Sequence, residues 1–469
     1  MDEIKRTLKR EERSWVAMDK FARDLGRSNL SFRFILLIWA ARKAYTRRSD
    51  RILEIHLLTK ISIINFKGIK QVELSLSPLT VFVGENATGK STVLQALSIL
   101  KRSTSHLGIN TELAYANLGP LSLLVPPAQT CTIAFQGWSD ARLKPLGIER
   151  VSFGCSVSFD GQGLSAYNTR LIVSDRDMLR NEWNRYGVQL VDPQTWKSGK
   201  ITIHFRPTNI IGMAFDLGGY GIEGSATPDE SKAAQDLHQN FAKLSSVIMS
   251  VLERFFVVAP LRGLTEPVYS LQPNPTQEFT PRAGTVQLGG NLATNLVYNR
   301  PNVARISEWQ AEIVGVGVET DVVPGAQVLV KNPDGGIDFV NEGFGSNQLL
   351  FVLERIANSP PDSVIGIEEP EIHLHPKAQF RFGKWASKTV PTLGKQLILL
   401  THSPDVVSGI LAGVRNKNIK PEDVSIWFFE RKDHEIVSTS SEVDEEGKVL
   451  GPALKSFLES TADQLWEKS

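Results

Sequence analysis

The sequence predicts an α/β fold in which a mostly parallel sheet carries a ligand site at one edge. The run from Gly84 to Ser91 has the spacing G-x-x-x-x-G-K-S, which is typical of a phosphate-binding loop between a strand and a helix. Two later apolar runs, each typical of a buried parallel strand, end in the polar pairs Glu368-Glu369 and Thr401-His402. Because ligands bind at the carboxyl ends of strands in such sheets, the three polar ends should converge on one site.

The glycine-rich run lies in the context that phosphate binding requires. It follows an apolar, β-branched run at 79–83 and precedes a run with helical spacing at 92–100. Backbone N–H groups of such a loop can surround an anion, while Lys90 adds a charge that should also assist catalysis and Ser91 offers a hydroxyl to Mg²⁺. The expected nucleotide contacts are Gly84, Asn86, Ala87, Thr88, Gly89, Lys90, Ser91 and Thr92. The alternative is a glycine-rich turn that happens to precede Lys-Ser.

Composition is that of an ordinary globular protein. The 469 residues exceed what one core usually fills, so two domains or one large domain with insertions is expected. A net charge of +1 gives no general attraction for DNA or membranes, so a nucleic-acid surface would have to be a local patch. Cys131 and Cys155 have no metal-ligand spacing, which favours a reducing, cytoplasmic compartment and inert thiols.

Residues 1–57 are interpreted as a basic N-terminal extension. Residues 1–60 contain fifteen Lys or Arg against eight Asp or Glu, and the apolar run at 34–41 is too short to span a membrane. We expect a helical appendage. The alternatives are an extension from an upstream start and a contact with a membrane surface or nucleic acid.

Hydrophobic periodicity and turn residues predict the other elements. Two strands at 61–66 and 72–76 precede the loop, and short antiparallel strands are expected within 130–215. Further along, the patterns predict an amphipathic helix at 231–255, a long exposed loop at 272–291, helices at 292–298 and 303–314, a short strand at 337–339 and a helix at 349–356.

The polar strand ends suit phosphoryl transfer. Glu368 would hold Mg²⁺ through a water, Glu369 would position and deprotonate the attacking water, and His402 would hydrogen-bond the terminal phosphate. Simpler interpretations are a solvated loop for the glutamates and a structural role for the histidine. His373 and His375 could form a metal pair, but no third ligand is evident nearby, so a loop after the carboxylates is favoured.

These motifs resemble those of the ABC-type ATPases of the SMC/RecF/OLD group. The ordered set is Gly84–Ser91 (Walker A), Gly343–Gln348 (signature), Glu368–Pro376 (Walker B onward) and Thr401–Pro404. More narrowly, the chain resembles OLD-like ATPases, often labelled AAA-type, without a TOPRIM domain. The resemblance implies a P-loop NTPase of ABC type with a mixed sheet, an antiparallel β subdomain and a helical lobe. The expected divisions are a basic extension at 1–57, lobe I with Walker A and the antiparallel subdomain at 58–230, a helical insertion and connecting segment at 231–340, the signature, Walker B and switch-histidine lobe at 341–410, and a β/helix tail at 411–469.

The resemblance also implies residue roles. Glu368 takes the Walker B magnesium position, Glu369 that of the catalytic glutamate, His402 that of the switch histidine and His375 the D-loop position. Glu368 stands where Asp is usual. Arg262, in a recurrent Pro-Leu-Arg element, is either an anion contact or a structural ion-pair partner, and the structural role is favoured.

Members of this group close their sites by head-to-tail dimerisation. The resemblance therefore implies that Gly345, Ser346 and Gln348 contact the γ-phosphate bound to the partner protomer. A glycine-rich segment at a helix N-terminus is physically suited to this, because it forms a second anion site. The sequence here reads Gly-Phe-Gly-Ser-Asn-Gln rather than Leu-Ser-Gly-Gly-Gln.

The resemblance implies an ATP- and Mg²⁺-dependent ATPase that dimerises, or forms a higher oligomer, on ATP and controls a partner in a phage-defence module. The residues after Ser403 contain no D-x-D pattern and no His/Asn cluster, so an effector nuclease or toxin is expected on another chain. The alternative is a RecF-like DNA-repair or DNA-binding ATPase, which requires a local basic surface. A non-catalytic scaffold is the third possibility. No membrane span is predicted.

Overall fold

The computed structural model describes most of the chain beyond residue 57. The described residues are 58–105, 113, 118–126, 129–138, 150–160, 163–173, 176–184, 187–189, 195–198, 201–205, 220–223, 252–272, 284–325, 327–333, 338–433, 435–452 and 454–458. The basic extension at 1–57 and nearly all of the amphipathic helix expected at 231–255 lie outside them. Residue 255, the last of that expected helix, is in a strand.

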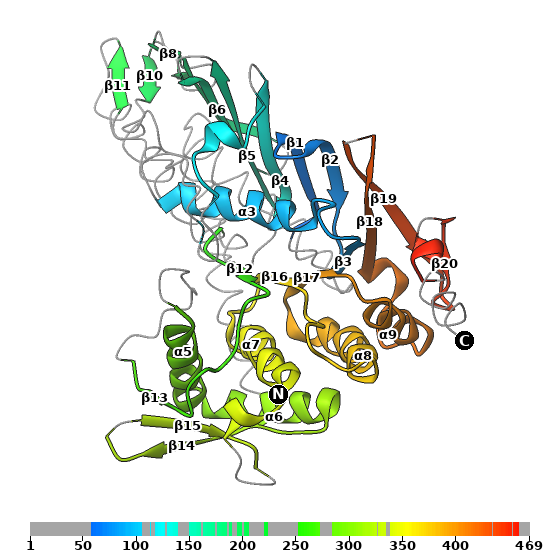
Figure 1. Cartoon of the computed structure of the whole chain (residues 1–469). Coiled ribbons are helices and arrows are strands. Elements are labelled where there is room, and N and C mark those ends of the chain that lie inside the picture. Colours follow the sequence, from blue (N-terminus) through cyan, green and yellow to red (C-terminus); the bar gives the residue numbers. More distant parts are fainter. Residues whose placement is uncertain are drawn as a thin grey trace, which may run out of the picture.

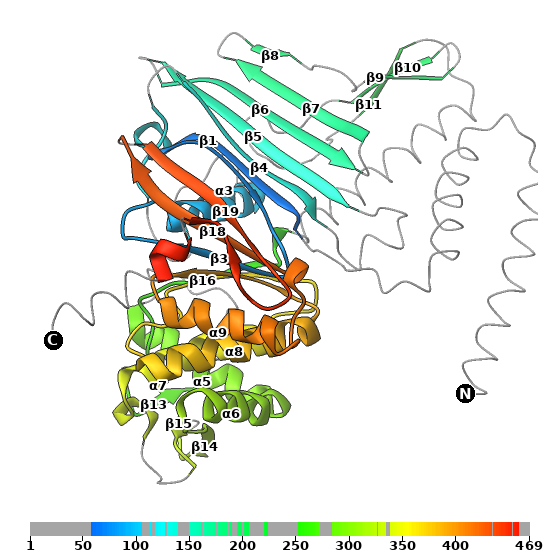
Figure 2. The ribbon, with the colours of Figure 1, turned by 90° about the vertical axis from the view of Figure 1, so that its right-hand side faces the viewer.

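An antiparallel sheet forms the outermost layer (Figures 1 and 2). Its strands lie in the order β2-β1-β4-β5-β6-β7-β8. Their bounds are β1 (Lys60–Phe66), β2 (Ile69–Ser75), β4 (Thr130–Trp138), β5 (Val151–Asp160), β6 (Gly163–Val173), β7 (Arg176–Asn184) and β8 (Gly187–Gln189). The predicted first hairpin and the predicted antiparallel strands are thereby confirmed.

The central sheet is mixed, as expected, and contains the strand of the phosphate-binding loop. Its order is β12-β16-β17-β3-β18-β19-β20. The first five strands are parallel, and β19 pairs antiparallel with both β18 and β20. The bounds are β12 (Phe255–Val258), β16 (Val364–Glu368), β17 (Gln396–Thr401), β3 (Leu79–Gly84), β18 (Val424–Lys432), β19 (Glu435–Val443) and β20 (Val449–Leu450). The three strands with polar ends, β16, β17 and β3, are immediate neighbours, which confirms that they converge.

Helices cover both faces of the central sheet, and two small sheets complete the fold. Helix α3 (Lys90–Ser105) lies between the central and antiparallel sheets, and the other helices lie on the opposite face (Figures 1 and 2). These are α5 (Gly284–Tyr298), α6 (Arg300–Val314), α7 (Phe344–Asn358), α8 (Pro376–Leu393) and α9 (Pro404–Arg415). The small antiparallel sheets are β9 (Thr195–Ser198), β10 (Ile201–Phe205) and β11 (Tyr220–Glu223), and β13 (Val268–Ser270), β14 (Glu319–Val323) and β15 (Gln327–Lys331).

Alternation along the central strands divides the core in two. Phe82, Ile398 and Leu400 pack in the core shared with α3, whereas Val81 and Leu399 pack in the core shared with α7 to α9. Successive side chains of a strand point to opposite faces, so a strand between two layers must be apolar throughout. This explains the continuous apolar runs in the sequence.

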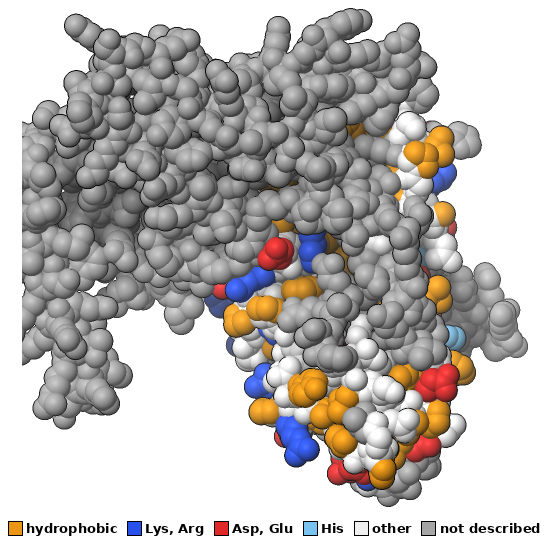
Figure 3. Space-filling model, turned by 90° about the vertical axis from the view of Figure 1, so that its left-hand side faces the viewer, with side chains coloured by type: hydrophobic (Ala, Val, Ile, Leu, Met, Phe, Trp, Pro, Cys, Tyr) orange, Lys and Arg blue, Asp and Glu red, His pale blue; other side chains and the backbone are white. Residues whose placement is uncertain are grey.

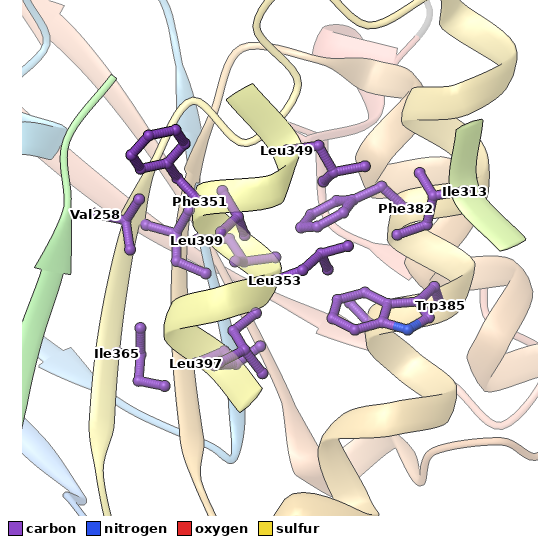
Figure 4. Close-up of a cluster of buried hydrophobic side chains, with 14 of the residues drawn as sticks. Val258, Ile313, Leu349, Phe351, Leu353, Ile365, Phe382, Trp385, Leu397 and Leu399 are labelled. Atoms are coloured by element: carbon purple, nitrogen blue, oxygen red, sulfur yellow. The ribbon is translucent and has the colours of Figure 1, made fainter. Parts of the chain in front are cut away.

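Helix α7 is the central helix of the second core. Leu349 and Leu353 lie between Leu399 of the sheet and the rings of Phe382 and Trp385 on α8 (Figure 4), and all five are at most 1% exposed. Burial of such a side chain contributes about 1.5–3 kcal/mol. The packing fixes α7, and with it the signature residues at its start, against the sheet.

Two sequence expectations are wrong. Of the residues expected as a strand at 337–339, residue 337 lies outside the described residues, Asp338 forms only an isolated bridge with Lys331, and Phe339 begins a 3-10 helix (Phe339–Asn341). The loop expected through residue 291 is helical from Gly284, the start of α5. Its glycines have a packing role, because a Cβ at Gly289 would lie 2.4 Å from Cζ of Tyr269.

The remaining global features concern the cysteines and hydrophobic helices. Cys131 and Cys155 are buried and free, and burial raises the pKa of the Cys131 thiol to about 12 and that of Cys155 in the same direction. Both thiols therefore stay protonated near neutral pH. Among the described residues, no helix has the length and apolar character needed to cross a bilayer.

The close contact of α8 and α9 generates a stability prediction. A Cβ at Gly409 would lie 2.1 Å from the carbonyl oxygen of Phe380, so Gly409→Ala should force the helices apart. We expect a loss of about 1–3 kcal/mol in the free energy of unfolding, measured by urea denaturation. Ser408→Ala on the same helix is the matched control and should change stability by less than about 0.5 kcal/mol. Equal stability of the two variants would contradict the packing argument.

Candidate active site

The backbone of the phosphate-binding loop requires glycine. Gly84 and Gly89 have φ of +145° and +91°, and a Cβ at Gly84 would lie 2.1 Å from the carbonyl oxygen of Phe429. Ala87 is also in the left-handed region, with φ +59°, and lies with Asn86 on the exposed side of the loop. The positive φ values at these positions turn the backbone sharply. Such turns are typical of loops whose N–H groups bind an anion.

Lys90 lies folded over this loop. Its Nζ donates to the carbonyl oxygens of Gly84 (2.9 Å) and Glu85 (2.7 Å) and, more weakly, to Oγ1 of Thr88 (3.4 Å). Burial lowers the pKa of Lys90 to about 8, against the opposing charges of nearby glutamates. Thr92 is buried, and its N–H donates to the carbonyl oxygen of Gly89 (3.1 Å), so it helps to form the first helical turn.

The two predicted metal ligands contact each other directly. Ser91 Oγ donates to Glu368 Oε2 at 2.7 Å, although 277 positions separate the residues. Oε1 of Glu368 is buried and has no hydrogen-bond partner among the described residues. Burial raises the pKa of this carboxyl, since a charged group is poorly solvated there. A hydroxyl and a carboxylate with an unused oxygen fit a hard cation such as Mg²⁺.

Glu369 and His402 lie beside this pair, directly after β16 and β17 respectively. Nε2 of His402 is 3.8 Å from Oε1 of Glu369, and both side chains are about one-third exposed, at 31% and 37%. Glu369 has φ +46°, a conformation unfavourable for a non-glycine residue, and its N–H donates to the carbonyl oxygen of Leu400. Burial, followed by the charge of Lys90, lowers the pKa of His402, so its imidazole is neutral near pH 7.

Arg262 joins three segments from beneath the site. Its guanidinium is buried and donates to four carbonyl oxygens: those of Ala259 (2.7 Å), Gln348 (3.1 Å), Glu368 (2.9 Å) and Glu369 (2.9 Å). Burial lowers the pKa of Arg262 to about 10, which leaves it charged at neutral pH. The favoured structural role agrees with these contacts, but the acceptors are backbone carbonyls rather than the carboxylate of an ion pair.

The remaining predicted contacts lie at the starts of α7 and α8. Gly345 packs on the turn after Glu368, where a Cβ would be 2.5 Å from the carbonyl oxygen of His373. The Ser346 carbonyl accepts from Gln310 Nε2 at 2.7 Å, and the side chain of Gln348 is buried, with Oε1 lacking a partner among the described residues. His375 caps α8, where its Nδ1 accepts from the N–H of Lys377. Their described contacts are with α6, Arg262, the turn after β16 and the start of α8.

Three further residues at the site were not identified from the sequence. Lys67, in the β1–β2 turn, donates to Gln95 Oε1 at 2.6 Å, and burial lowers its pKa although the charge of Glu368 opposes the shift. Arg431, from the β18–β19 hairpin, donates to the carbonyl oxygen of Ala87 at 3.3 Å. The third is Glu371, which is buried between two strand ends. Each depends on a tertiary contact that has no local signal in the sequence.

The arrangement is chemically suited to transfer of a phosphoryl group to water. One edge of the sheet presents a bent anion-binding loop, an amine, a hydroxyl–carboxylate pair and a second carboxylate beside a neutral imidazole. These groups can respectively hold phosphates, bind a cation and activate water. Within the described part of the chain, no group of three or more His, Cys, Asp or Glu side chains could hold a metal ion, so His373 and His375 have no partner for a metal site.

Comparison with solved structures finds SMC head domains. One, described as an SmcHead bound to the C-winged helix domain of ScpA, is 14% identical, with 82% of this chain and 97% of that chain covered and a TM-score of 0.41. The SMC head domain from Thermotoga maritima is 13% identical, with 82% and 99% covered and a TM-score of 0.34. An Smc head from Pyrococcus furiosus, with an extended coiled coil and bound to the C-terminal domain of ScpA, is 13% identical, with 87% and 98% covered and a TM-score of 0.38.

A family comparison covers the site itself. A search among curated proteins finds no match. The family model described as AAA ATPase domain matches residues 57–251 and 290–407, which together are more than half of the chain and include the carboxyl ends of β3, β16 and β17. The chain therefore belongs to the AAA ATPase domain family.

Proposed function

We propose that this protein hydrolyses ATP with Mg²⁺ at the carboxyl edge of its central sheet. The observation that carries the proposal is the 2.7 Å contact between Ser91 and Glu368, with Lys90, Glu369 and His402 around it. Bound Mg²⁺ would neutralise phosphate charge, held by Ser91 and Glu368. Lys90 would contact the phosphates, Glu369 would accept a proton from the attacking water, and neutral His402 would hydrogen-bond the terminal phosphate.

The proposal includes head-to-tail dimerisation on ATP. The contacts described for Gly345, Ser346 and His375 are with the turn after β16, α6 and the start of α8 rather than with the phosphate-binding loop, which is consistent with action on the partner's nucleotide. Phe344 beside them is 74% exposed, so its ring is available for contact with a partner protomer. We infer that each complete site combines the loop of one protomer with the α7 start of the other.

The biological output is proposed from the motifs. We infer an OLD-like switch in the cytoplasm that passes its nucleotide state to an effector nuclease or toxin, as in phage-defence modules. A RecF-like role on DNA needs a continuous basic surface. On the described part of the face in Figure 3 both basic and acidic side chains are visible, so this part does not present the purely basic surface that suits DNA.

Removal of the proposed base should stop hydrolysis but not binding. Glu369→Gln keeps the shape of the side chain but cannot accept a proton, so kcat should fall at least about a hundredfold with ATP affinity nearly unchanged. Phosphate release and nucleotide binding are measured on the same preparations. The matched control is Glu422→Gln, an exposed glutamate near Lys420, which should behave as wild type. Hydrolysis by the Glu369 variant at the wild-type rate would refute this assignment.

Nucleotide affinity should weaken as pH rises through about 8. Because burial lowers the pKa of Lys90 to about 8, the free protein loses this positive charge above that pH, while bound phosphates favour the charged form. Binding should therefore take up a proton above pH 8 and be pH-independent with respect to Lys90 below it. Calorimetric titration with Mg-ATP between about pH 7 and pH 10 measures the effect. In Lys90→Ala the slope should disappear; a flat wild-type profile would contradict the prediction.

Complementation should reveal composite sites. Lys90→Ala disables the loop of its own protomer. Ser346→Glu places a negative charge where the partner's phosphate is expected. The second change should not disturb α7 itself, because acidic residues are favourable near a helix N-terminus. Each variant alone should be inactive. An equal mixture should recover about a quarter of wild-type activity, since half the dimers are mixed and each has one intact site. A mixture as inactive as its components would exclude the head-to-tail arrangement.

A further inference from the structure

Glu371 connects the two strand ends that carry Glu369 and His402. Its side chain is only 8% exposed, and Oε1 accepts from Oγ1 of Thr401 (2.7 Å) and from the N–H of His402 (2.7 Å). Oε2 is also buried and has no hydrogen-bond partner among the described residues. A carboxylate from the turn after β16 is therefore hydrogen-bonded to a side chain and a main-chain N–H at the end of β17.

The same residue also anchors the turn in which Glu369 lies. The N–H of Leu374 donates to the carbonyl oxygen of Glu371 (2.9 Å), and that of Ile372 donates to the carbonyl oxygen of Glu369 (3.2 Å). Glu369 and His373 both have positive φ, at +46° and +59°. Such conformations persist only where surrounding contacts determine them, and Glu371 supplies contacts on both sides.

The burial of this acid is unfavourable by itself. A carboxylate removed from water is destabilising unless hydrogen bonds compensate, and one of its oxygens has no compensation among the described residues. The two bonds that it does make both reach the end of β17, one through Thr401 and one at His402. Their common effect is to fix the main chain of His402 relative to the turn that holds Glu369.

We propose that Glu371 is a positioning residue for hydrolysis, which sets the separation between Glu369 and the imidazole of His402. The inference rests on the function proposed above. Glu371 itself does not touch the reacting atoms; it acts through the Thr401 hydroxyl and the His402 amide. Small displacements of catalytic groups reduce rates strongly while leaving binding intact, so its removal should lower kcat and leave ATP affinity almost unchanged.

The test uses variants at both ends of the bond in the full chain. Glu371→Ala should lower kcat about a hundredfold and Thr401→Val, which keeps the side-chain shape, about tenfold, with the Kd for ATP within about twofold of wild type. The double variant should be less than tenfold slower than Glu371→Ala alone, because the bond between Thr401 and Glu371 is already lost in that variant and Thr401→Val then removes only the acceptor of the Ser403 N–H. Glu371→Gln and Thr401→Ser keep an acceptor and a donor and should restore most of kcat.

Thr80→Val is the matched control for a purely structural effect. Thr80 is fully buried at the amino end of β3, opposite the carboxyl ends that carry the site, and its hydroxyl exchanges hydrogen bonds with the backbone of Ser77. The change should lower the melting temperature about as much as Thr401→Val does, with kcat unchanged. Hydrogen exchange at the His402 amide adds a readout independent of hydrolysis: it should accelerate in Glu371→Ala and stay slow in Glu371→Gln.

The outcomes separate the two proposals. Wild-type hydrolysis with unchanged kcat in Glu371→Ala and Thr401→Val overturns the positioning role alone. Equal loss of kcat in Thr80→Val, or a loss of ATP affinity as large as the loss of kcat, also overturns it, because either result indicates general destabilisation. A wild-type protein that binds but never hydrolyses ATP removes both the proposed function and this role. A selective loss of kcat, rescued by the conservative variants, supports it.

Discussion

The parallel register of β16, β17 and β3 is the constraint on which the site depends. Pairing of Glu368 with Leu400, and of Thr401 with Val83, brings three strand ends to one level at the same edge. The hydrogen bond of Ser91 to Glu368 is possible only in this register. Side chains alternate along a strand, so a slip of one residue would turn Glu368 to the other face of the sheet. An apolar side chain would then take its place at the site. Packing of both faces therefore protects the geometry of the site.

Backbone carbonyls, rather than opposite charges, connect the site to the rest of the molecule. Arg262 binds the end of β16 and the first turn of α7 at once, through the carbonyls of Glu368 and Gln348. The turn after β16 also touches Gly345. A displacement of the strand end next to Glu369 should therefore also shift the start of α7. The buried guanidinium can satisfy several carbonyls because it has five donors in a fixed plane, which a lysine could not replace.

The sequence predicts those parts of the site that lie at strand ends, because continuous apolar runs and glycine spacing are local signals. It placed the start of α7 too late, at 349 rather than Phe344, since Gly345 and Ser346 carry no apolar period. It missed β13 to β15, which are short, and the helical start of α5, where glycine serves contact with Tyr269. Arg431 beside Ala87 could not be predicted, because that contact exists only once β18 pairs with β3.

The ionisable groups of the site are shifted toward their neutral forms in the absence of a ligand. Burial lowers the pKa of Lys90 and of His402 and raises that of Glu368, so each group is displaced toward its neutral form. Desolvation by burial is the largest cause of all three pKa shifts, so holding the charged groups in this site is electrostatically unfavourable. Phosphate oxygens beside the amine, and a cation beside the carboxylate, would each stabilise the charged form again. Because Glu368 is one of the charges that oppose the lowering of the Lys90 pKa, a cation on Glu368 would weaken that support, and the two positions would be coupled favourably through the direct attraction between cation and phosphate.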